Sequence, residues 1–310
     1  MPNKHASNAS RADVKAKANA NAFAALADRY AVLGQPVAHS QSPFIHAQFA
    51  LQTGQALHYD RIECPMDGFE AAVRRFVDSG DPARGLGAAR GCNITVPFKF
   101  QVLPLAAQAS ERALLAQAAN VLRFDADGWF ADNTDGMGLV QDIQVHAGLA
   151  LADRRVLLLG AGGAAAGVLG PVLATRPRQV VVANRSAGKA QTLVQRHQAW
   201  AEAHGVDLTH SALDAVIGRF DLVLNGTASS LAGAAVPVAG SVLAPGALAV
   251  DMMYGAPALP FLRWAAEHGA RGRDGLGMLV EQAAGAFELW RGVRPQTPPV
   301  LAALRQRLAH

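Results

Sequence analysis

The order of apolar and polar residues along the chain predicts strands that alternate with helices. From Tyr30 onward, apolar runs such as YAVLG, LHYDRIE, CNITVP, RVLLLG and QVVVAN are separated by turns and by segments of helical periodicity, such as SPFIHAQFALQ and DGFEAAVRRFVDSG. Strands separated by helices indicate parallel sheets with covered faces, so the predicted fold class is α/β. In VLRFDADGWFAD, by contrast, Asp-Ala-Asp-Gly predicts a turn between two neighbouring strand-like segments.

Length and composition narrow the class of protein further. The 310 residues are enough for two domains, and 51% hydrophobic with 17% charged residues is typical of a folded globular protein. No run of about 18 apolar residues occurs, so we expect no membrane span. The two cysteines, Cys64 and Cys92, are too few for a disulfide framework or a cysteine-rich zinc site. We therefore expect no metal and a reduced, cytoplasmic setting.

The excess of positive charge belongs mostly to the first residues. The chain carries a net charge of +4, and residues 1–20 hold four Lys and Arg against Asp13 alone, which leaves +1 for the rest. Because no stripe of basic and aromatic residues follows, we expect no nucleic-acid partner. Residues 1–28 lack periodic strong hydrophobes and are predicted to form a disordered extension or a frayed helix.

The segment VLLLGAGGAAAG carries a dinucleotide-binding pattern. Gly160, Gly162 and Ala165 satisfy G-x-G-x-x-G/A directly after a strand and at the start of a helix. The glycines permit a tight turn and the close approach of a pyrophosphate, which the helix N-terminus attracts. The competing interpretation is tight strand-to-helix packing without a nucleotide.

The end of the next strand distinguishes between NAD and NADP. An NAD-binding unit offers Asp or Glu there to the adenosine ribose, whereas this strand ends in Asn184, Arg185 and Ser186, with Lys189 one helical turn later. Two cations without a carboxylate suit a ribose 2′-phosphate, and hence NADP. The alternative is that both cations are solvated charges at a helix start.

Polar clusters before this motif are candidates for a substrate site. In AHSQSPFIH, Ser42 is predicted to cap a helix, yet Ser40 adds a second hydroxyl beside the same positive helix end, which suits a carboxylate. In GCNITVPFK, Asn93 and Thr95 share one face of a strand. Lys99 lies beyond the proline that ends this strand, and is either a solvated loop charge or directed at a ligand.

Two further polar segments follow along the chain. Asn120 precedes a strand-like run, and DNTDG places Asp132 and Asp135 on either side of Asn133 and Thr134. A helix cap by Thr134 or Asp135 is the structural explanation of the second segment.

Taken together, these motifs resemble the shikimate dehydrogenase family. HSQSP, NITVPFK, DNTDG, GAGGAAAG, NRS, DMMY and DGLGMLVEQ occur in this order, and the resemblance covers essentially residues 29–309. It implies an enzyme that uses NADP for the reversible reduction of 3-dehydroshikimate to shikimate, in the shikimate pathway of aromatic amino-acid biosynthesis. It also implies an N-terminal α/β substrate domain, residues 29–131 plus 274–310, and a Rossmann-type dinucleotide-binding domain with a parallel sheet, residues 132–273.

The resemblance implies a role for each matching residue. Lys99 and Asp135 would be the catalytic pair, with Lys99 acting either as proton donor or mainly as a fixed cation. The substrate would be bound by Ser40, Ser42, Asn93, Thr95, Lys99, Asn120, Asp135, Tyr254 and Gln282. The cofactor would be bound by Gly160, Ala161, Gly162, Gly163, Ala164, Asn184, Arg185, Ser186, Lys189, Thr227, Met252, Gly275, Gly277 and Met278. The stretch NGTASS around Thr227 departs from the family's usual sequence.

Two other functions are compatible with these residues. A quinate/shikimate dehydrogenase with a relaxed ring pocket or cofactor choice would carry the same motifs. A non-catalytic NADP-binding sensor would use the same fold, although it would not need to retain both Lys99 and Asp135. The sequence is compatible with a homodimer and does not identify an interface.

Overall fold

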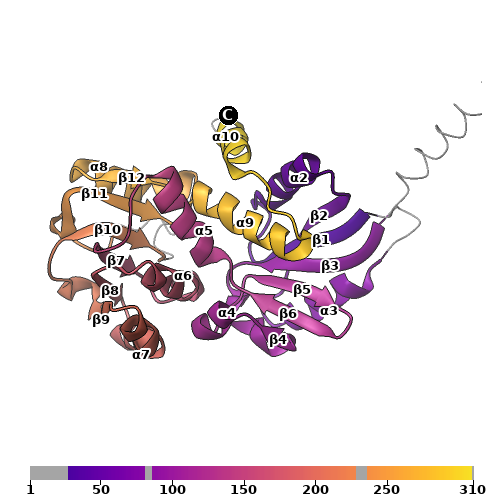
Figure 1. Ribbon diagram of the computed structural model, residues 1–310, viewed down its shortest axis with the longest axis horizontal. Coiled ribbons are helices and arrows are strands. Elements are labelled where there is room, and N and C mark those ends of the chain that lie inside the picture. Colours follow the sequence, from indigo (N-terminus) through magenta and orange to yellow (C-terminus); the bar gives the residue numbers. More distant parts are fainter. Residues whose placement is uncertain (1–26, 81–85, 228–235, 309–310) are drawn as a thin grey trace, which may run out of the picture.

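The computed structural model describes residues 27–80, 86–227 and 236–308, which form two sheets side by side with helices around both (Figure 1). The first sheet has the strand order β2 (Leu57–Glu63), β1 (Ala27–Gly34), β3 (Leu86–Ile94), β5 (Val121–Asp125), β6 (Gly128–Asp132), β4 (Gln108–Ala109). The second has the order β12 (Arg271–Arg273), β11 (Leu243–Asp251), β10 (Phe220–Asn225), β7 (Arg155–Leu159), β8 (Gln179–Asn184), β9 (Asp207–Ala212).

The second sheet confirms the predicted Rossmann-type architecture. All of its neighbouring strands pair in parallel. Numbered along the chain from β7, the order is 3-2-1-4-5-6, which is that of the doubly wound dinucleotide-binding fold. The order reverses between β7 and β10, and a ligand crevice is expected outside the carboxyl ends of these two strands.

The first sheet is mixed, as its predicted turn between two neighbouring strands requires. β1 pairs in parallel with β2 and β3, whereas β5 is antiparallel to both β3 and β6. The predicted turn accounts for the pairing of β5 with β6: Asp125 pairs with Gly128 across a two-residue loop, and Gly128 has a φ of 128°. A loop this short can only join antiparallel strands.

The predicted disordered tail falls mostly outside the described residues, which begin at residue 27. Ala27 and Asp28, which the prediction included in the tail, instead belong to β1. The Asp28 carboxylate pairs with Arg291 at 2.5 Å and with Arg90 at 3.2 Å. The pair with Arg291 attaches the first strand to a helix near the C-terminus, and the pair with Arg90 attaches it to β3.

Helices cover the sheets on both sides. The helices that precede the dinucleotide motif are α2 (Ser42–Thr53), α3 (Phe69–Asp78), α4 (Glu111–Ala116) and α5 (Asp135–Gln141), the last of which continues into a π-helical turn, Asp142–His146. The later helices are α6 (Gly163–Ala174), α7 (Ala187–Ala203), α8 (Leu259–Glu267), α9 (Leu276–Arg291) and α10 (Thr297–Leu308). Among the described residues, none of these helices is long and apolar enough to cross a membrane.

Helix α9 joins the two halves of the molecule, and Figure 1 shows it in yellow running from one sheet to the other. Its apolar residues share a core with α2 and α10, in which Ile45, Phe49, Phe287 and Leu304 are buried. At its far end, the indole Nε1 of Trp290 donates to the carbonyl of Leu122 in the first sheet. The C-terminal helices therefore pack on the N-terminal half of the protein.

His46 is a buried titratable group on α2, which packs against the first sheet. Its ring stacks on that of Tyr59 with centroids 4.3 Å apart, and it lies edge-on to Phe49. Burial lowers the pKa of His46 to about 3, and the neighbouring Asn93 side chain offsets part of this effect. The imidazole is therefore neutral in the folded protein across the physiological range.

We predict that His46 makes the protein sensitive to mild acid. The unfolded imidazole binds a proton below about pH 6.5, whereas the folded one does so only near pH 3, so stability falls between these values as the pH falls. Between pH 7 and pH 5, His46→Phe should lose about 2 kcal/mol less unfolding free energy than the wild type. Urea denaturation at the two pH values measures this difference.

The control for this prediction is His210→Ala, because His210 is an exposed histidine on β9. This variant removes a surface histidine without emptying the core, and its loss of stability between the two pH values is the reference for that of His46→Phe. If His46→Phe shows the same loss between pH 7 and pH 5 as the wild type, then His46 does not titrate as its burial requires.

Candidate active site

The loops after β7 and β10 lie at the point where the strand order of the second sheet reverses. The first residue after β7, Gly160, has a φ of 105°, which side chains disfavour. A Cβ on Gly160 would also lie 2.9 Å from the carbonyl oxygen of Gly226, so the two loops are in close contact. Gly162 is exposed, and a Cβ there would meet nothing within 4 Å. Ala161, which lies between these glycines, is half-buried, and so is Ala164, two residues after Gly162.

Lys99 is paired with Asp135. Lys99 lies on a short 3-10 helix, Phe98–Gln101, and its Nζ is 2.5 Å from Oδ2 of Asp135, the first residue of α5. The two side chains are only 12% and 5% exposed, so this is not the solvated loop charge of the alternative interpretation. The side chain of Lys99 also lies against the glycine-rich loop, because a Cβ on Gly163 would be 3.3 Å from its Cβ. The polar segments of the first half therefore meet the dinucleotide motif.

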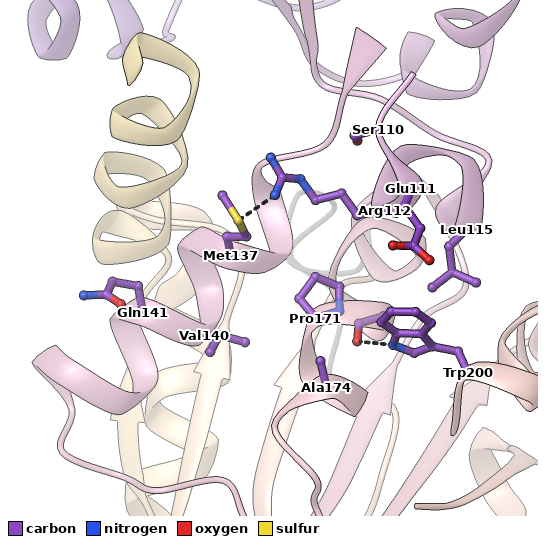
Figure 2. Close-up of a pocket in the computed structure, with 11 residues that line it drawn as sticks. Ser110, Glu111, Arg112, Leu115, Met137, Val140, Gln141, Pro171, Ala174 and Trp200 are labelled. Atoms are coloured by element: carbon purple, nitrogen blue, oxygen red, sulfur yellow. Dashed lines mark hydrogen bonds between the residues drawn. The ribbon is translucent and has the colours of Figure 1, made fainter. Parts of the chain in front are cut away.

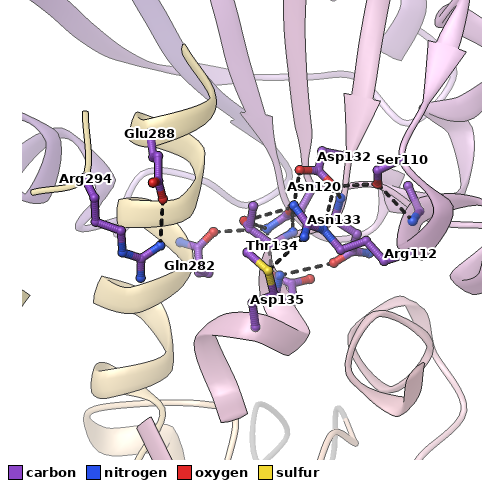
Figure 3. A network of polar contacts seen from close by, with 12 residues as sticks. Ser110, Arg112, Asn120, Asp132, Asn133, Thr134, Asp135, Gln282, Glu288 and Arg294 are labelled. Carbon is purple, nitrogen blue, oxygen red and sulfur yellow. Dashed lines mark hydrogen bonds and ion pairs between the residues drawn. The ribbon is translucent and has the colours of Figure 1, made fainter. Parts of the chain in front are cut away.

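Asn120 is the centre of a buried polar network at the start of α5 (Figure 3). Its Nδ2 donates to Asp135 Oδ1 at 2.8 Å and to Gln282 Oε1 on α9 at 3.0 Å. Its Oδ1 accepts from the backbone N–H of Thr134 at 2.8 Å. One amide thus links β5, α5 and α9.

Thr134 stands at the N-cap of α5, but its side chain makes no capping hydrogen bond. A helix cap by the Thr134 side chain therefore does not explain the polar residues of DNTDG. Instead, Asn133 Oδ1 accepts from the backbone N–H of Asp135 at 3.2 Å, and its Nδ2 donates to the carbonyl of Ala118.

Asn93 and Thr95 stand at the end of β3, as predicted. The side chain of Asn93 is buried and accepts from the hydroxyl of Tyr59 at 2.6 Å, while its Nδ2 donates to the carbonyl of Asn120. Thr95 follows the last residue of the strand and is half-buried. Asn93 is therefore connected to the Asn120 network through the protein itself.

Ser40 and Ser42 lie together at the start of α2, with Oγ atoms 3.2 Å apart. The prediction that Ser42 caps α2 is wrong: Gln41 is at the N-cap and its side chain makes no capping bond, while Ser42 is already helical and its backbone N–H donates to Ser40 Oγ at 3.3 Å. The helix-compatible backbone of Gln41 moves the cap one residue earlier. The Ser42 hydroxyl is therefore not used by the helix terminus.

Arg61 adds a positive charge beside this serine pair, which the sequence analysis missed. From β2, its Nε and a terminal nitrogen both donate to the carbonyl of Ser40, at 2.8 and 2.6 Å. The alternation of LHYDRIE placed Arg61 on a strand but gave no indication of this contact, which joins residues 21 positions apart.

Tyr254 reaches this region from the loop after β11. It packs against the core that includes Ile45 and Phe49, and its phenol hydrogen-bonds the backbone of Gln41. Burial raises the pKa of the phenol, and the bond to Gln41 and the charge of Arg61 act in the opposite direction. Tyr254 therefore links the second half of the molecule to the loop that carries Ser40 and Ser42.

The ends of β10 and β11 are joined by hydrogen bonds beside Gly226. Asn225 Nδ2 donates to Asp251 Oδ2 at 3.0 Å, and its Oδ1 accepts from the Thr227 hydroxyl at 2.7 Å. A Cβ on Gly226 would lie 3.3 Å from the sulfur of Met252. Thr227 and Met252 thus border the same strand ends as Gly160.

Asn184, Arg185, Ser186 and Lys189 surround the end of β8 and the start of α7. The side chains of Arg185, Ser186 and Lys189 are exposed, and in the described part of the chain neither cation forms an ion pair. Ser186 is at the N-cap of α7 but its hydroxyl makes no cap bond, while Asn184 Nδ2 donates to its carbonyl. These groups are available to an anionic ligand.

Gly275, Gly277 and Met278 begin α9. A Cβ on Gly275 would collide with the carbonyl oxygen of Met252, and one on Gly277 would collide with Oδ1 of Asp142. Met278 is 7% exposed and belongs to the core of the second half. The start of α9 is thus closely packed against both the β11 loop and the π-helical turn.

The cavity drawn in Figure 2 is separate from this site. It has a volume of about 510 Å³ and lies between α4, α5, α6 and α7, with Met137, Pro171 and Trp200 among its walls. Neither Lys99 nor Asp135 lines it. Among the described residues, no group of three or more His, Cys, Asp or Glu is placed to hold a metal ion.

The fold and site define a two-domain α/β protein of the dehydrogenase type, with a Lys–Asp pair facing a dinucleotide loop. Family profiles match in three segments: the shikimate dehydrogenase substrate binding domain at residues 32–122, shikimate / quinate 5-dehydrogenase at 143–234, and the shikimate 5'-dehydrogenase C-terminal domain at 275–305. A relative from Methylibium petroleiphilum, named shikimate dehydrogenase (NADP(+)), is 64% identical over 92% of this chain and 96% of its own. The chain belongs to the shikimate dehydrogenase family.

Solved structures agree with this assignment. An Ael1 enzyme from Pseudomonas putida is 46% identical and superposes with a TM-score of 0.79, covering 90% of this chain and 98% of its own. Shikimate 5-dehydrogenase from Thermus thermophilus, in complex with NADP(H) and shikimate, is 28% identical with a TM-score of 0.76, covering 91% and 100%.

Two glycine substitutions should separate packing from cofactor binding. Gly162→Ala places a methyl group in open space, so the thermal unfolding temperature should stay within about 2 °C of the wild type. The same methyl group should obstruct a pyrophosphate and weaken NADP binding about 10-fold or more.

Gly277→Ala collides with the buried, paired carboxylate of Asp142 and should cost about 1–3 kcal/mol of stability.

Differential scanning calorimetry and titration calorimetry with NADP measure the two effects. Normal NADP affinity in Gly162→Ala would contradict the assignment of this loop to the pyrophosphate. An unchanged unfolding temperature in Gly277→Ala would contradict the close contact between α9 and Asp142.

Proposed function

We propose that this protein catalyses the reversible reduction of 3-dehydroshikimate to shikimate with NADP, in the shikimate pathway. The observation that carries the proposal is the buried pair of Lys99 and Asp135, whose lysine lies against the glycine-rich loop at Gly163. The relative at 64% identity and another at 56%, from Acidovorax, are both named for shikimate and NADP(+).

The residues present suit NADP as the cofactor. The turn at Gly160 has the positive φ that the motif requires, and the exposed Gly162 leaves room for a pyrophosphate at the start of α6. Arg185, Lys189 and the Ser186 hydroxyl offer charge-assisted hydrogen bonds to a 2′-phosphate. Ala161, Gly163, Ala164, Asn184, Thr227, Met252, Gly275, Gly277 and Met278 complete the proposed binding surface. When bound, the cofactor supplies the hydride for the carbonyl carbon.

The protein's own residues must provide the proton and hold the substrate. As the carbonyl is reduced, negative charge develops on its oxygen, and we propose that the Lys99 ammonium stabilises this charge and supplies the proton, which its pairing with Asp135 supports. Asp135 holds Lys99 in place through Oδ2 and is itself held by Asn120 through Oδ1. In the oxidation direction, the same groups receive the proton from the substrate hydroxyl.

The substrate carboxylate is proposed to bind at Ser40 and Ser42. Their neighbouring hydroxyls can both donate to one carboxylate, and the charge of Arg61 lies just behind Ser40. Tyr254 encloses this loop from the other half of the molecule. The remaining proposed contacts to the ring hydroxyls come from Asn93, Thr95, Asn120, Asp135 and Gln282.

The proposed domains follow the two sheets. Residues 29–131 with 274–310 form the substrate domain, and residues 132–273 form the NADP-binding domain. We also propose that the protein works in the cytoplasm, which is supported by two free cysteines and by the absence of a candidate membrane helix among the described residues. A homodimer stays a prediction.

The other two functions have less support. A non-catalytic sensor has no need for a buried lysine–carboxylate pair at the dinucleotide loop, and unused buried charges are costly to retain. A relaxed quinate/shikimate dehydrogenase with free cofactor choice is not favoured by the names of the relatives or by the cations at Arg185 and Lys189.

The proposal is tested by an absorbance assay of nicotinamide reduction with shikimate or quinate, each with NADP or NAD. We expect strong turnover with shikimate and NADP alone. Lys99→Ala should lower kcat about 100-fold or more while NADP still binds, because the oxygen loses its cation and proton source. Comparable quinate turnover would indicate the relaxed enzyme, and NADP binding without turnover on either acid would indicate the sensor.

Arg185→Ala should reduce the preference for NADP over NAD about 10- to 100-fold. Losing one charge-assisted bond to the 2′-phosphate should weaken NADP binding about 10- to 100-fold and leave NAD binding unchanged. The matched control is Arg178→Ala, because Arg178 is an exposed arginine at the opposite end of β8. Equal loss of affinity for NADP and NAD in Arg185→Ala would refute the phosphate assignment.

A further inference from the structure

Asp132 is a buried carboxylate three residues before Asp135, and the hydrogen bonds that it accepts hold the DNTDG loop (Figure 3). Its Oδ1 accepts from the Ser110 hydroxyl at 2.5 Å, from Arg112 Nε at 2.7 Å and from the backbone N–H of Asn133 at 2.7 Å. A terminal nitrogen of Arg112 donates to Oδ2. The carboxylate is thus held from both of its oxygens.

These bonds continue to the proposed catalytic pair. Asn133, whose backbone N–H binds Asp132, accepts from the backbone N–H of Asp135 through its own Oδ1. Asp135 in turn is paired with Lys99. Asp132, Asn133 and Asp135 therefore connect the Arg112 guanidinium to the lysine, and each link is a hydrogen bond between buried or half-buried groups.

Among these hydrogen-bonded residues, Arg112 is the one that is open to solvent. Its side chain is 34% exposed, whereas that of Asp132 is 3% exposed. It lines the cavity of about 510 Å³, where its other terminal nitrogen faces the sulfur of Met137 at 2.8 Å (Figure 2). A buried carboxylate that loses the cation with which it is paired is strongly unfavourable, so removal of Arg112 is expected to destabilise the DNTDG loop in its present position.

We propose that Arg112 is a positioning residue for the reaction: by neutralising Asp132, it sets the position of Asp135 and thereby that of Lys99. The proposal rests on the proposed function, because it needs Lys99 and Asp135 to be the catalytic pair. The polar side-chain contacts of Arg112 among the described residues are with Asp132 and Met137, not with the dinucleotide loop. Its effect reaches the reaction through the backbone of residues 132–135.

The experiment is chemical rescue of Arg112→Ala. Truncation opens a guanidinium-sized space onto the existing cavity, from which free guanidinium can reach Asp132. Displacement of the loop should lower kcat about 10- to 100-fold, with KM for NADP changed less than about 3-fold. Guanidinium, added far below the concentration that unfolds the protein, should restore at least part of kcat.

Two further variants keep the test independent of folding. Arg112→Lys retains the charge but loses the two-point contact with both carboxylate oxygens, and should lie between the wild type and Arg112→Ala. Arg123→Ala removes a partly exposed arginine from β5, where it pairs with Asp125. It should keep the wild-type kcat and show no activation by guanidinium.

Each outcome decides the proposal. A fall in kcat that guanidinium restores supports it. Wild-type kcat in Arg112→Ala, or a fall without rescue, overturns it. Lys99→Ala distinguishes this failure from a failure of the proposed function: if that variant retains normal turnover, the catalytic pair is wrong, and if it is inactive while Arg112→Ala is normal, only the positioning role is wrong.

Discussion

The close contact between α5 and α9 is the constraint on which the site depends. A Cβ on Gly138 would lie 2.6 Å from the backbone nitrogen of Gln282, and one on Gly285 would lie 3.2 Å from Thr134. Glycines at these positions allow the two helices to approach far more closely than side chains would permit. Only at this separation can Asn120 bond to Asp135 on one helix and to Gln282 on the other.

Buried ion pairs also hold the segments next to this contact between α5 and α9. Asp142, at the end of α5, is paired with Arg273 through both of its oxygens. Glu281 on α9 accepts from His146 at 2.8 Å and from Arg294 at 3.0 Å. A buried carboxylate is tolerated only when it is paired, so these contacts strongly disfavour other arrangements of the two segments. As a consequence, α5 with its π-helical turn and α9, which both connect the two sheets, are held against each other.

The two sheets contribute different parts of the proposed reaction. The parallel sheet presents Gly160 and Gly226 where its strand order reverses, a geometry that suits a dinucleotide whatever the substrate. The mixed sheet contributes Lys99, from the 3-10 helix that follows β3, and Asn120, from the residue before β5. Contact of Lys99 with Gly163 joins the two, so the proposed hydride and proton sites lie at one interface.

The sequence by itself determined the local elements and the identity of the chemical groups. Strand periodicity, the Asp-Ala-Asp-Gly turn and the pattern from Gly160 to Ala165 act over a few residues, and local geometry is enough to interpret them. The family resemblance indicated the pairing of Lys99 with Asp135, which lie 36 positions apart. It did not reveal how closely the side chains are buried together. Only the tertiary structure decided which polar groups meet across the fold: Arg112 contacts Asp132 across 20 positions, and Asn120 contacts Gln282 across 162. The cap of α2 fell on Gln41, and β5 turned back against β3. These outcomes depend on the packing of whole elements, because a side chain's partner is set by distances in space that no local pattern encodes.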